Sequence, residues 1–179
     1  MGVCDVKDLK AALTDLPNEL DATVVEFLFM QNPLARFAAH RRQLPGQNFP
    51  GLGLGKEMLA LLSFAGKKTN RDMLVENPQY LHNALIYFKA GMRFLSPHCE
   101  AFFEILMEDL AHEIEKDFAN VAHACNEGRI ECLGEKFVWP VCWEQVLPLS
   151  KRAIAHVEHG RPLIEQLKKM TKRPIFLMK

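Results

Sequence analysis

The chain has 179 residues, of which 49% are hydrophobic, so it can bury the core of a single domain over residues 1–179, and this argues against intrinsic disorder. Lysine plus arginine and aspartate plus glutamate balance at 22 each, so no net field draws the chain to nucleic acid or to an anionic membrane. Five cysteines, an odd number without CxxC spacing, argue against both a disulfide framework and a zinc ribbon.

The first residues lack a charged segment followed by an apolar one, as a secretory leader would have. No apolar run approaches the roughly 20 residues that span a bilayer. We therefore expect a soluble protein of the cytoplasm with reduced thiols.

The predicted elements begin with a helix over residues 5–16, which Asp5 caps and Pro17 ends. Residues 21–30, DATVVEFLFM, are β-branched and aromatic and are closed by Asn32-Pro33, which predicts a strand. Residues 33–50 have few periodic positions, and we expect an extended loop with a helical turn near 34–40. Loops of this length are often functional.

From Gly53 the hydrophobic period changes to that of an amphipathic helix ending near Gly66. A strand is predicted at 71–78, a helix at 79–90 with Gly91 as its cap, and a short strand in MRFL, 92–95. The order is strand, loop, helix, strand, helix, strand. This alternation predicts an α/β layer arrangement with parallel pairing.

The second half reads as a mainly helical extension, residues 98–179, beyond a core at about 21–97. After Ser96-Pro97 one long helix is predicted over 98–126 and ends at Gly128. RIECL and KFVWP, joined by Gly134-Glu135, predict a β-hairpin, with two tryptophans beside it that pack a small core. A helical stretch follows from about 149 to 170, interrupted at 160–162.

The segment PGLGLGKEML, residues 50–59, places Gly51, Gly53 and Gly55 directly before a predicted helix. Bare backbone before a helix N-terminus lets an anion approach unpaired N–H groups. Two nucleotide-binding motifs do not fit this segment. A Walker A loop needs a glycine five positions before its Gly-Lys and a Ser or Thr after it, but Pro50 and Glu57 stand at these positions around Gly55-Lys56. A dinucleotide-binding GxGxxG fingerprint needs its third glycine where Lys56 stands.

A third pattern fits better, since VEFLFM (25–30), GLGKEML (53–59) and IYFKAGM (86–92) follow one another in this order. Here the chain resembles the GNAT-type N-acetyltransferases, whose acyl-CoA N-acyltransferase fold has a strand, a glycine loop, a helix holding the acetyl-CoA pyrophosphate, a second strand and a helix ending in a phrase like LYEKAGF. The resemblance spans roughly residues 21–97.

The resemblance implies acetyl transfer from acetyl-CoA to an unknown amine. It implies a general base at Glu26 and a general acid at Tyr87, which would protonate the departing CoA thiolate. It also implies a CoA-binding set in the strand, the loop and the helix start: Phe29, Met30, Gly51, Gly53, Leu54, Gly55 and Lys56.

Two departures accompany the resemblance. Pro50 stands where the family has Gln or Arg, and only about twenty residues precede the first strand, where the family builds three strands and two helices. The missing strands would come from the hairpin at 129–140 or from a second protomer of a homodimer. Otherwise the domain is a degenerate relative that binds CoA without catalysis, or that binds nothing.

Other interpretations stay open at each position. The glycines also suit a tight turn, Glu26 the polar face of a strand, and Tyr87 a packed core tyrosine. His112 and Glu108 lie one helical turn apart without a second close pair of ligands, so we expect no metal. Two other functional classes are an interaction protein that uses the helical second half and, less favoured by the neutral charge, a nucleic-acid binder that would need its scattered basic groups to converge.

Overall fold

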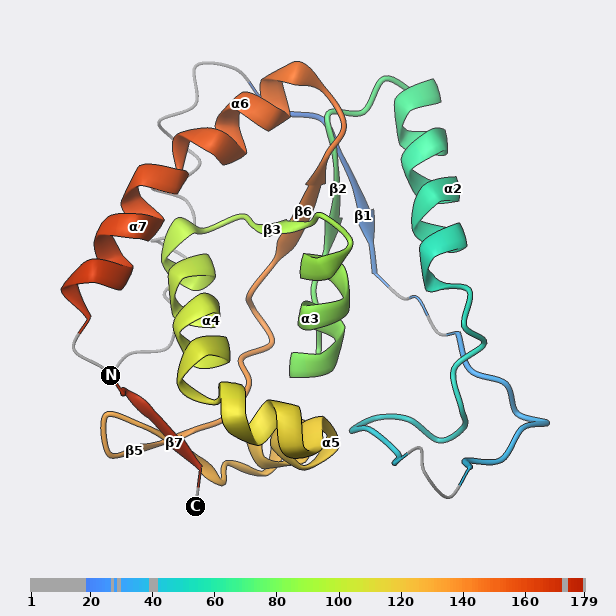
Figure 1. Ribbon diagram of the computed structural model, residues 1–179. Helices are drawn as coiled ribbons and strands as arrows, with labels where there is room; N and C mark the ends of the chain where they lie inside the picture. The colour runs from blue at the N-terminus through green and yellow to red at the C-terminus, as the bar shows by residue number, and fades with distance from the viewer. Residues whose placement is uncertain (1–18, 27, 29, 39–41, 172–173, 179) are drawn as a thin grey trace.

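The computed structural model describes residues 19–26, 28, 30–38, 42–171 and 174–178, and it shows a mixed α/β fold with two sheets (Figure 1). The predicted helix at 5–16 lies outside the described residues. The larger sheet has four strands in the order β1-β2-β6-β3. These strands are β1 (Ala22–Val25), β2 (Met73–Glu76), β6 (Gln145–Pro148) and β3 (Arg93–Phe94).

The prediction of parallel pairing is right for one strand pair and wrong for the others. β1 and β2 are parallel, with Val25 opposite Glu76, but β6 runs antiparallel between β2 and β3. β6 was not predicted, because its four residues include a proline and the polar Gln145 and so lack an apolar alternation.

The other elements of the first half follow the predicted order. α2 (Gly55–Lys68) and α3 (Leu81–Lys89) connect the three strands as expected, and the segment between β1 and α2 is a loop in its described part. In the described part of that loop, residues 33–34 form a turn and residues 35–38 are not helical, so the expected helical turn does not form over 35–38. Gly66 is the buried residue of α2, where the helix approaches Leu74 and Leu149 closely.

The single helix predicted over 98–126 is wrong, because the helical segment is interrupted at Leu110 and kinks again at Asp117, whose φ of −159° and ψ of 85° are not helical. α4 (Pro97–Asp109) and α5 (Ala111–Glu127) meet at Leu110 and run in different directions (Figure 1). Leu110 has φ −100° and ψ 16°, and its side chain is buried in the core. The apolar stripe continues through the break, which is why the sequence pattern did not reveal it. Gly128 ends α5 in the left-handed conformation, as expected.

The second sheet has three strands in the order β5-β4-β7. β4 (Ile130–Cys132) and β5 (Glu135–Phe137) form the predicted antiparallel hairpin. The unpredicted β7 (Phe176–Met178) pairs with β4. The hairpin therefore belongs to this smaller sheet and does not supply strands beside β1. α6 (Lys151–His159) and α7 (Arg161–Met170) meet at Gly160, within the predicted interruption at 160–162.

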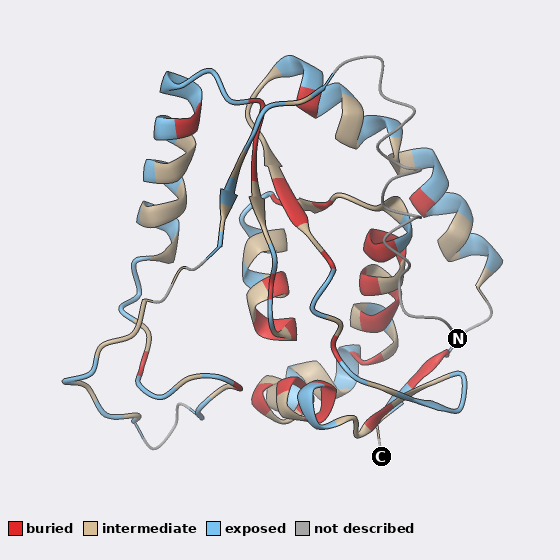
Figure 2. Cartoon of the chain, turned by 180° about the vertical axis from the view of Figure 1, so that it is seen from behind, coloured by how far each residue is buried: buried red, intermediate tan, exposed pale blue. Residues whose placement is uncertain are grey.

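The main core lies between α3, α4, α5 and the smaller sheet, where buried residues concentrate (Figure 2). Phe103 of α4 is 1% exposed and contacts the rings of Phe88, Phe94 and Trp139. Trp139 and Trp143 belong to this main core and do not form a small core of their own. A second cluster joins α6 to the opposite face of the four-stranded sheet through Met73, Val146 and Ala153. None of the described helices is both long enough and apolar enough to cross a membrane.

Candidate functional site

The two parallel strands separate beyond their last paired residues, Val25 and Glu76. The chain after β1 turns away from β2 and pairs with the glycine segment instead. The N–H of Leu52 donates to the carbonyl of Met30 at 3.0 Å, and the N–H of Asn32 donates to the carbonyl of Pro50 at 2.8 Å. We call this divergence the fork. It places the glycine segment against residues 30–32, beyond the carboxyl end of β1, and the carboxyl ends of strands are where open α/β sheets commonly bind ligands.

The side chain of Gln31 holds the loop that carries the glycines. Its Oε1 accepts hydrogen bonds from the N–H groups of Asn48, at 2.9 Å, and Phe49, at 2.8 Å. Its Nε2 donates to the carbonyl of Gly46 at 3.3 Å. The loop is also attached to α5, where Arg42 pairs with Asp117. The glycine segment thus has a defined position at the fork.

The backbone before α2 is open on its outer side. Gly53 has a φ of +76°, and a Cβ placed on it would meet no atom within 4 Å. Gly51 lies beside the carbonyl of Met30, and Gly55 lies at the edge of contact with the Met30 side chain. Only Gly53 requires the conformational freedom of glycine, because its φ lies in the left-handed region.

The first turn of α2 presents unpaired donors. No side chain caps the helix, and Met58 N–H, which donates to Leu54 at 2.9 Å, begins its hydrogen-bond ladder. Within the described residues, the N–H groups of 53–57 have no acceptor in the protein. These amides and the positive end of the helix dipole therefore favour an anion at this point.

A small cavity lies between the four-stranded sheet and the two helices α2 and α3, beside the last paired residues of β1 and β2. Its volume is about 20 Å³, which is room for about one water molecule. Its lining is apolar except for Glu76 and Tyr87 and otherwise consists of Val25, Leu28, Leu59, Leu62, Leu74 and Met92. Leu59 and Leu62 belong to α2, so the cavity shares this helix with the open amides.

The two polar groups of the cavity form a hydrogen-bonded pair. The hydroxyl of Tyr87 donates to Glu76 Oε1 at 3.1 Å. Burial raises the pKa of Glu76 above its ordinary value, against the opposing effect of the Tyr87 hydroxyl. Burial and then the neighbouring Glu76 carboxylate raise the pKa of Tyr87, so the phenol stays protonated. The pair can accept a proton at the carboxyl and donate one at the phenol.

The structure brings together part of the predicted set. Tyr87 lines the cavity, while Met30, Gly51 and Gly55 meet at the fork. The side chains of Leu54 and Lys56 are exposed. Glu26, the other predicted catalytic residue, is exposed and does not line the cavity. Phe29 lies outside the described residues.

Glu76 is a residue of the site that was not predicted from the sequence. It ends the strand before Asn77-Pro78, and β2 is parallel to β1. Because parallel strands have their carboxyl ends at the same edge of a sheet, a polar residue at the end of the second strand was a usable signal. The family pattern instead drew attention to Glu26, at the end of the first strand.

The remaining sequence candidates do not form a second such site. Among the described residues, no group of three or more His, Cys, Asp or Glu side chains could hold a metal ion. Two of the predicted basic groups lie apart in the described part of the chain: Lys67 and Lys68 end α2, whereas Lys168 lies on α7, across the molecule, where it pairs with Glu104 and Glu108 (Figure 1). This chain gave no significant match in comparisons with protein-family models, with curated proteins or with solved structures.

Proposed function

We propose that the fork binds a CoA-type ligand and that the chain transfers an acetyl group from acetyl-CoA to an amine. The observation that carries this proposal is the run of backbone N–H groups at residues 53–57 that have no acceptor among the described residues. They lie at the start of α2, and this helix also lines the Tyr87–Glu76 cavity. A ligand with an anionic end and an acyl end matches these two features. The resemblance to GNAT-type N-acetyltransferases names that ligand, and the geometry of the fork supports it.

The residues of the fork fit the parts of such a ligand. The amides before α2 would hold the pyrophosphate without a side chain in the way. The apolar wall of Val25, Leu28 and Leu59 would take the uncharged arm. The cavity holds only about one water molecule, so the acyl end reaches Tyr87 only when side chains of α2 move.

In the proposed reaction the nitrogen of the amine forms a bond with the acetyl carbonyl carbon, and the carbon–sulfur bond breaks. Glu76 accepts the proton that the amine loses, since its raised pKa makes it a better base than an exposed carboxylate. Tyr87 donates its proton to the departing thiolate and recovers one from Glu76 through their 3.1 Å hydrogen bond. The products are an amide and the free thiol.

A thermal-shift titration with acetyl-CoA, CoA and ADP tests the binding step. A ligand at about 100 times its Kd stabilises the folded state by about 2.7 kcal/mol, which raises the Tm measurably. We expect a saturable rise for the wild-type chain that Gly53→Val abolishes. Gly134→Val is a matched control, because Gly134 also has a positive φ, +84°, with nothing within 4 Å, but it lies in the β4–β5 turn.

The outcomes separate cleanly. A shift that persists in Gly53→Val, or no shift of the wild type at about 1 mM ligand, rejects the CoA site at the fork. If binding holds, Tyr87→Phe and Glu76→Gln should keep the thermal shift and lose about 10²-fold or more of the rate of CoA release with a panel of amines. Loss of rate only in Glu26→Gln would assign the base to Glu26, as the resemblance implies.

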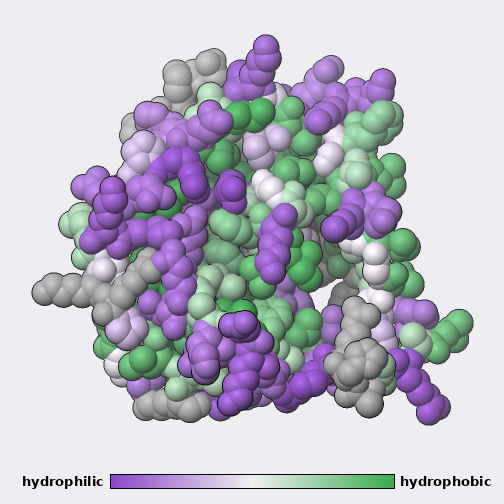
Figure 3. All heavy atoms as spheres, viewed as in Figure 1, coloured by the Kyte–Doolittle hydropathy of each residue, from purple (hydrophilic) through white to green (hydrophobic). Residues whose placement is uncertain are grey.

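A second candidate function is an interaction domain without catalysis. Hydrophobic side chains are exposed on α6 and α7, at Ile154, Leu163 and Met170, and on α2, at Leu61 and Phe64. Figure 3 shows hydrophobic surface along α2 at the right of the view. This alternative predicts no response to acetyl-CoA and a concentration-dependent mass in light scattering or capture of a protein partner.

A further inference from the structure

A second pocket lies away from the fork, where α6 and α7 meet the four-stranded sheet. Its volume is about 400 Å³, within the range of small-molecule sites. It lies beside Pro148, which pairs with Met73 at the amino end of β2, whereas the fork lies beyond Glu76 at the carboxyl end. The proposed CoA site therefore does not account for this pocket.

Two arginines from different elements enter this pocket and converge on one buried carboxylate. Arg161, at the start of α7, donates to Glu100 Oε1 at 2.9 Å, and Nε of Arg93, on β3, lies 3.9 Å from the same oxygen. The Glu100 side chain is 2% exposed. The guanidinium of Arg93 also lies 4.5 Å from the centre of the Phe88 ring. Both arginines are thus held in place before any ligand arrives.

Both arginines have guanidinium N–H groups that no described residue accepts. A guanidinium carries five N–H donors, and no hydrogen bond joins the Arg93 guanidinium to another residue in the described part of the chain. The other oxygen of Glu100 accepts the N–H of Phe94 at 2.9 Å, and Nη1 of Arg161 also lies 3.5 Å from Glu104 Oε1. The other N–H groups of the two guanidinium groups have no acceptor in the described part of the chain. A ligand carboxylate can take the remaining N–H groups in the paired geometry that arginine favours.

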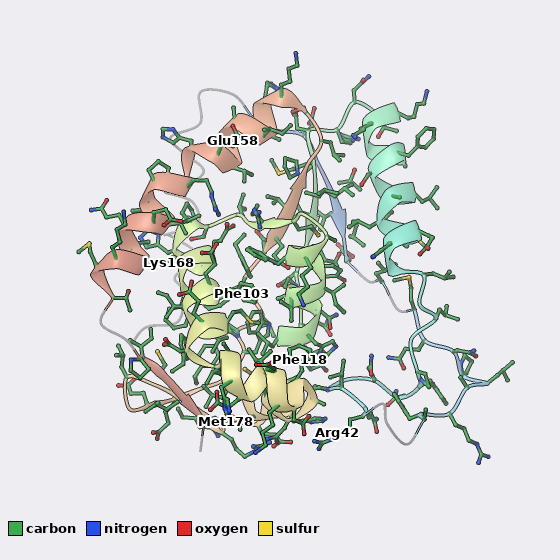
Figure 4. The ribbon with its side chains drawn as sticks, viewed as in Figure 1. Arg42, Phe103, Phe118, Glu158, Lys168 and Met178 are labelled. Carbon is green, nitrogen blue, oxygen red and sulfur yellow. The ribbon has the colours of Figure 1, made fainter. Side chains whose placement is uncertain are left out.

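The pocket also contains one acidic group and an apolar wall. Glu158, on α6 beside the start of α7 (Figure 4), lines the pocket and forms no ion pair with another described residue. Pro148, Ile154 and Val157 supply the apolar surface. Because Glu100 and Glu104 already neutralise part of the arginine charge, a plain anion gains less here than a ligand that also offers a cation to Glu158.

We propose that this pocket binds a small zwitterion, an amino acid with an apolar side chain. Its carboxylate lies against Arg93 and Arg161, its ammonium group against Glu158, and its side chain against Ile154 and Val157. This site is independent of the proposed function at the fork.

The test is an NMR titration of the full chain with L-leucine, following backbone amides. We expect saturable shift changes confined to residues 91–93, 146–148 and 154–161. 4-Methylpentanoate, which lacks the ammonium group, and 3-methylbutylamine, which lacks the carboxylate, should each bind at least about tenfold more weakly than leucine.

Two variants and one control make the test specific. Arg93→Gln and Glu158→Gln should each weaken leucine binding about tenfold or more. Arg93→Gln leaves Glu100 its bonds to Arg161 and Phe94, so the chain should stay folded. Arg129→Gln, which removes an arginine paired with Glu127 outside the pocket, should leave leucine binding unchanged.

Three results would overturn the proposal. One is the absence of saturation at about 50 mM leucine. Another is equal leucine affinity in the wild type and in both pocket variants. The third is 4-methylpentanoate binding as tightly as leucine, which would make the pocket a site for simple organic anions.

Discussion

The two helices α4 and α2 show how unevenly this chain uses its apolar residues. α4 buries six residues of its length, and Phe103 points from it toward α3 in the centre of the core (Figure 4). α2 buries only Gly66 and leaves Leu61 59% and Phe64 60% exposed. Burial of apolar surface is the main source of stability. The half that contains α4 should therefore hold the fold together, while the half that contains α2 carries the fork.

This difference is consistent with how binding sites are built. Segments that admit a ligand come from the less stable parts of a protein, because they must move. The cavity below the fork is too small for an acyl group unless Leu59 or Leu62 of α2 shifts. A helix with few buried residues can shift at a small cost in free energy, whereas α4 cannot.

The largest expected effect tests the contrast directly. Phe103→Ala should lower the free energy of unfolding by about 3–5 kcal/mol, because it leaves a cavity among Phe88, Phe94 and Trp139. Phe64→Ala removes the same side chain from the exposed face of α2 and should change it by less than about 0.5 kcal/mol. Urea denaturation followed by circular dichroism measures both. Equal losses would show that α2 contributes to the stable core.

Many of the secondary-structure elements could be located from the sequence. Hydrophobic periodicity together with glycine and proline stops located α2, β2, α3 and the β4–β5 hairpin close to their observed bounds. β6 was missed because QVLP contains a proline and a polar residue, and β7 was missed because FLM is uniformly apolar and shows no alternation. The break at Leu110 was missed because the residue is apolar and continues the stripe of both helices.

The candidate site was predictable only where a motif marked it. The glycines before α2 and the tyrosine of IYFKAGM followed from a local pattern. The Tyr87–Glu76 hydrogen bond depends on β2 lying beside β1 and beneath α3, which is a tertiary arrangement. In the Arg93–Glu100–Arg161 group, β3 and α4 follow one another in the chain, but Arg161 lies 61 residues beyond Glu100, and no sequence pattern predicts that contact.

The next effect concerns Asp72, which ties the two regions together. Its carboxylate accepts the N–H of Asp21, before β1, at 3.0 Å and pairs with Arg152 of α6 at 2.6 Å. Hydrogen bonds from Ser150, Asp21 and Arg152 lower the pKa of Asp72 from 3.8 to about 2. The ionised form is therefore favoured by folding, and its stabilisation is present above pH 3.8 and lost as the pH falls through 2.

Asp72→Asn should lower the urea midpoint at pH 5, by less than Phe103→Ala does, and the difference from the wild type should shrink as the pH approaches 2. Asp21→Asn is the control, because its exposed side chain lies 3.9 Å from Arg71 and its N–H still reaches Asp72. A loss of stability in Asp72→Asn that does not vary with pH would mean that the shape of the Asp72 side chain, and not its charge, stabilises the link between β1 and α6.

The smallest effect belongs to Glu76, in the less buried region. Its pKa is raised, so folding favours the protonated carboxyl. The stabilisation from that proton is present below the ordinary value of 4.5 and is lost as the pH rises through the pKa of the folded state. Glu76→Gln removes this loss and keeps an oxygen for the Tyr87 hydroxyl. The variant should match the wild type near pH 4 and exceed its stability at pH 8 by less than about 1 kcal/mol.

Urea curves at the two pH values measure this difference, and Glu26→Gln, an exposed glutamate beside the fork, should show none. A Glu76→Gln variant that is less stable than the wild type at both pH values would mean that the Glu76 carboxylate stabilises the fold through its contacts. A variant that is more stable at pH 8 but inactive would mean that the fold keeps a buried acid against its own stability. Residues of that kind are retained for chemistry, because selection on folding alone would remove them.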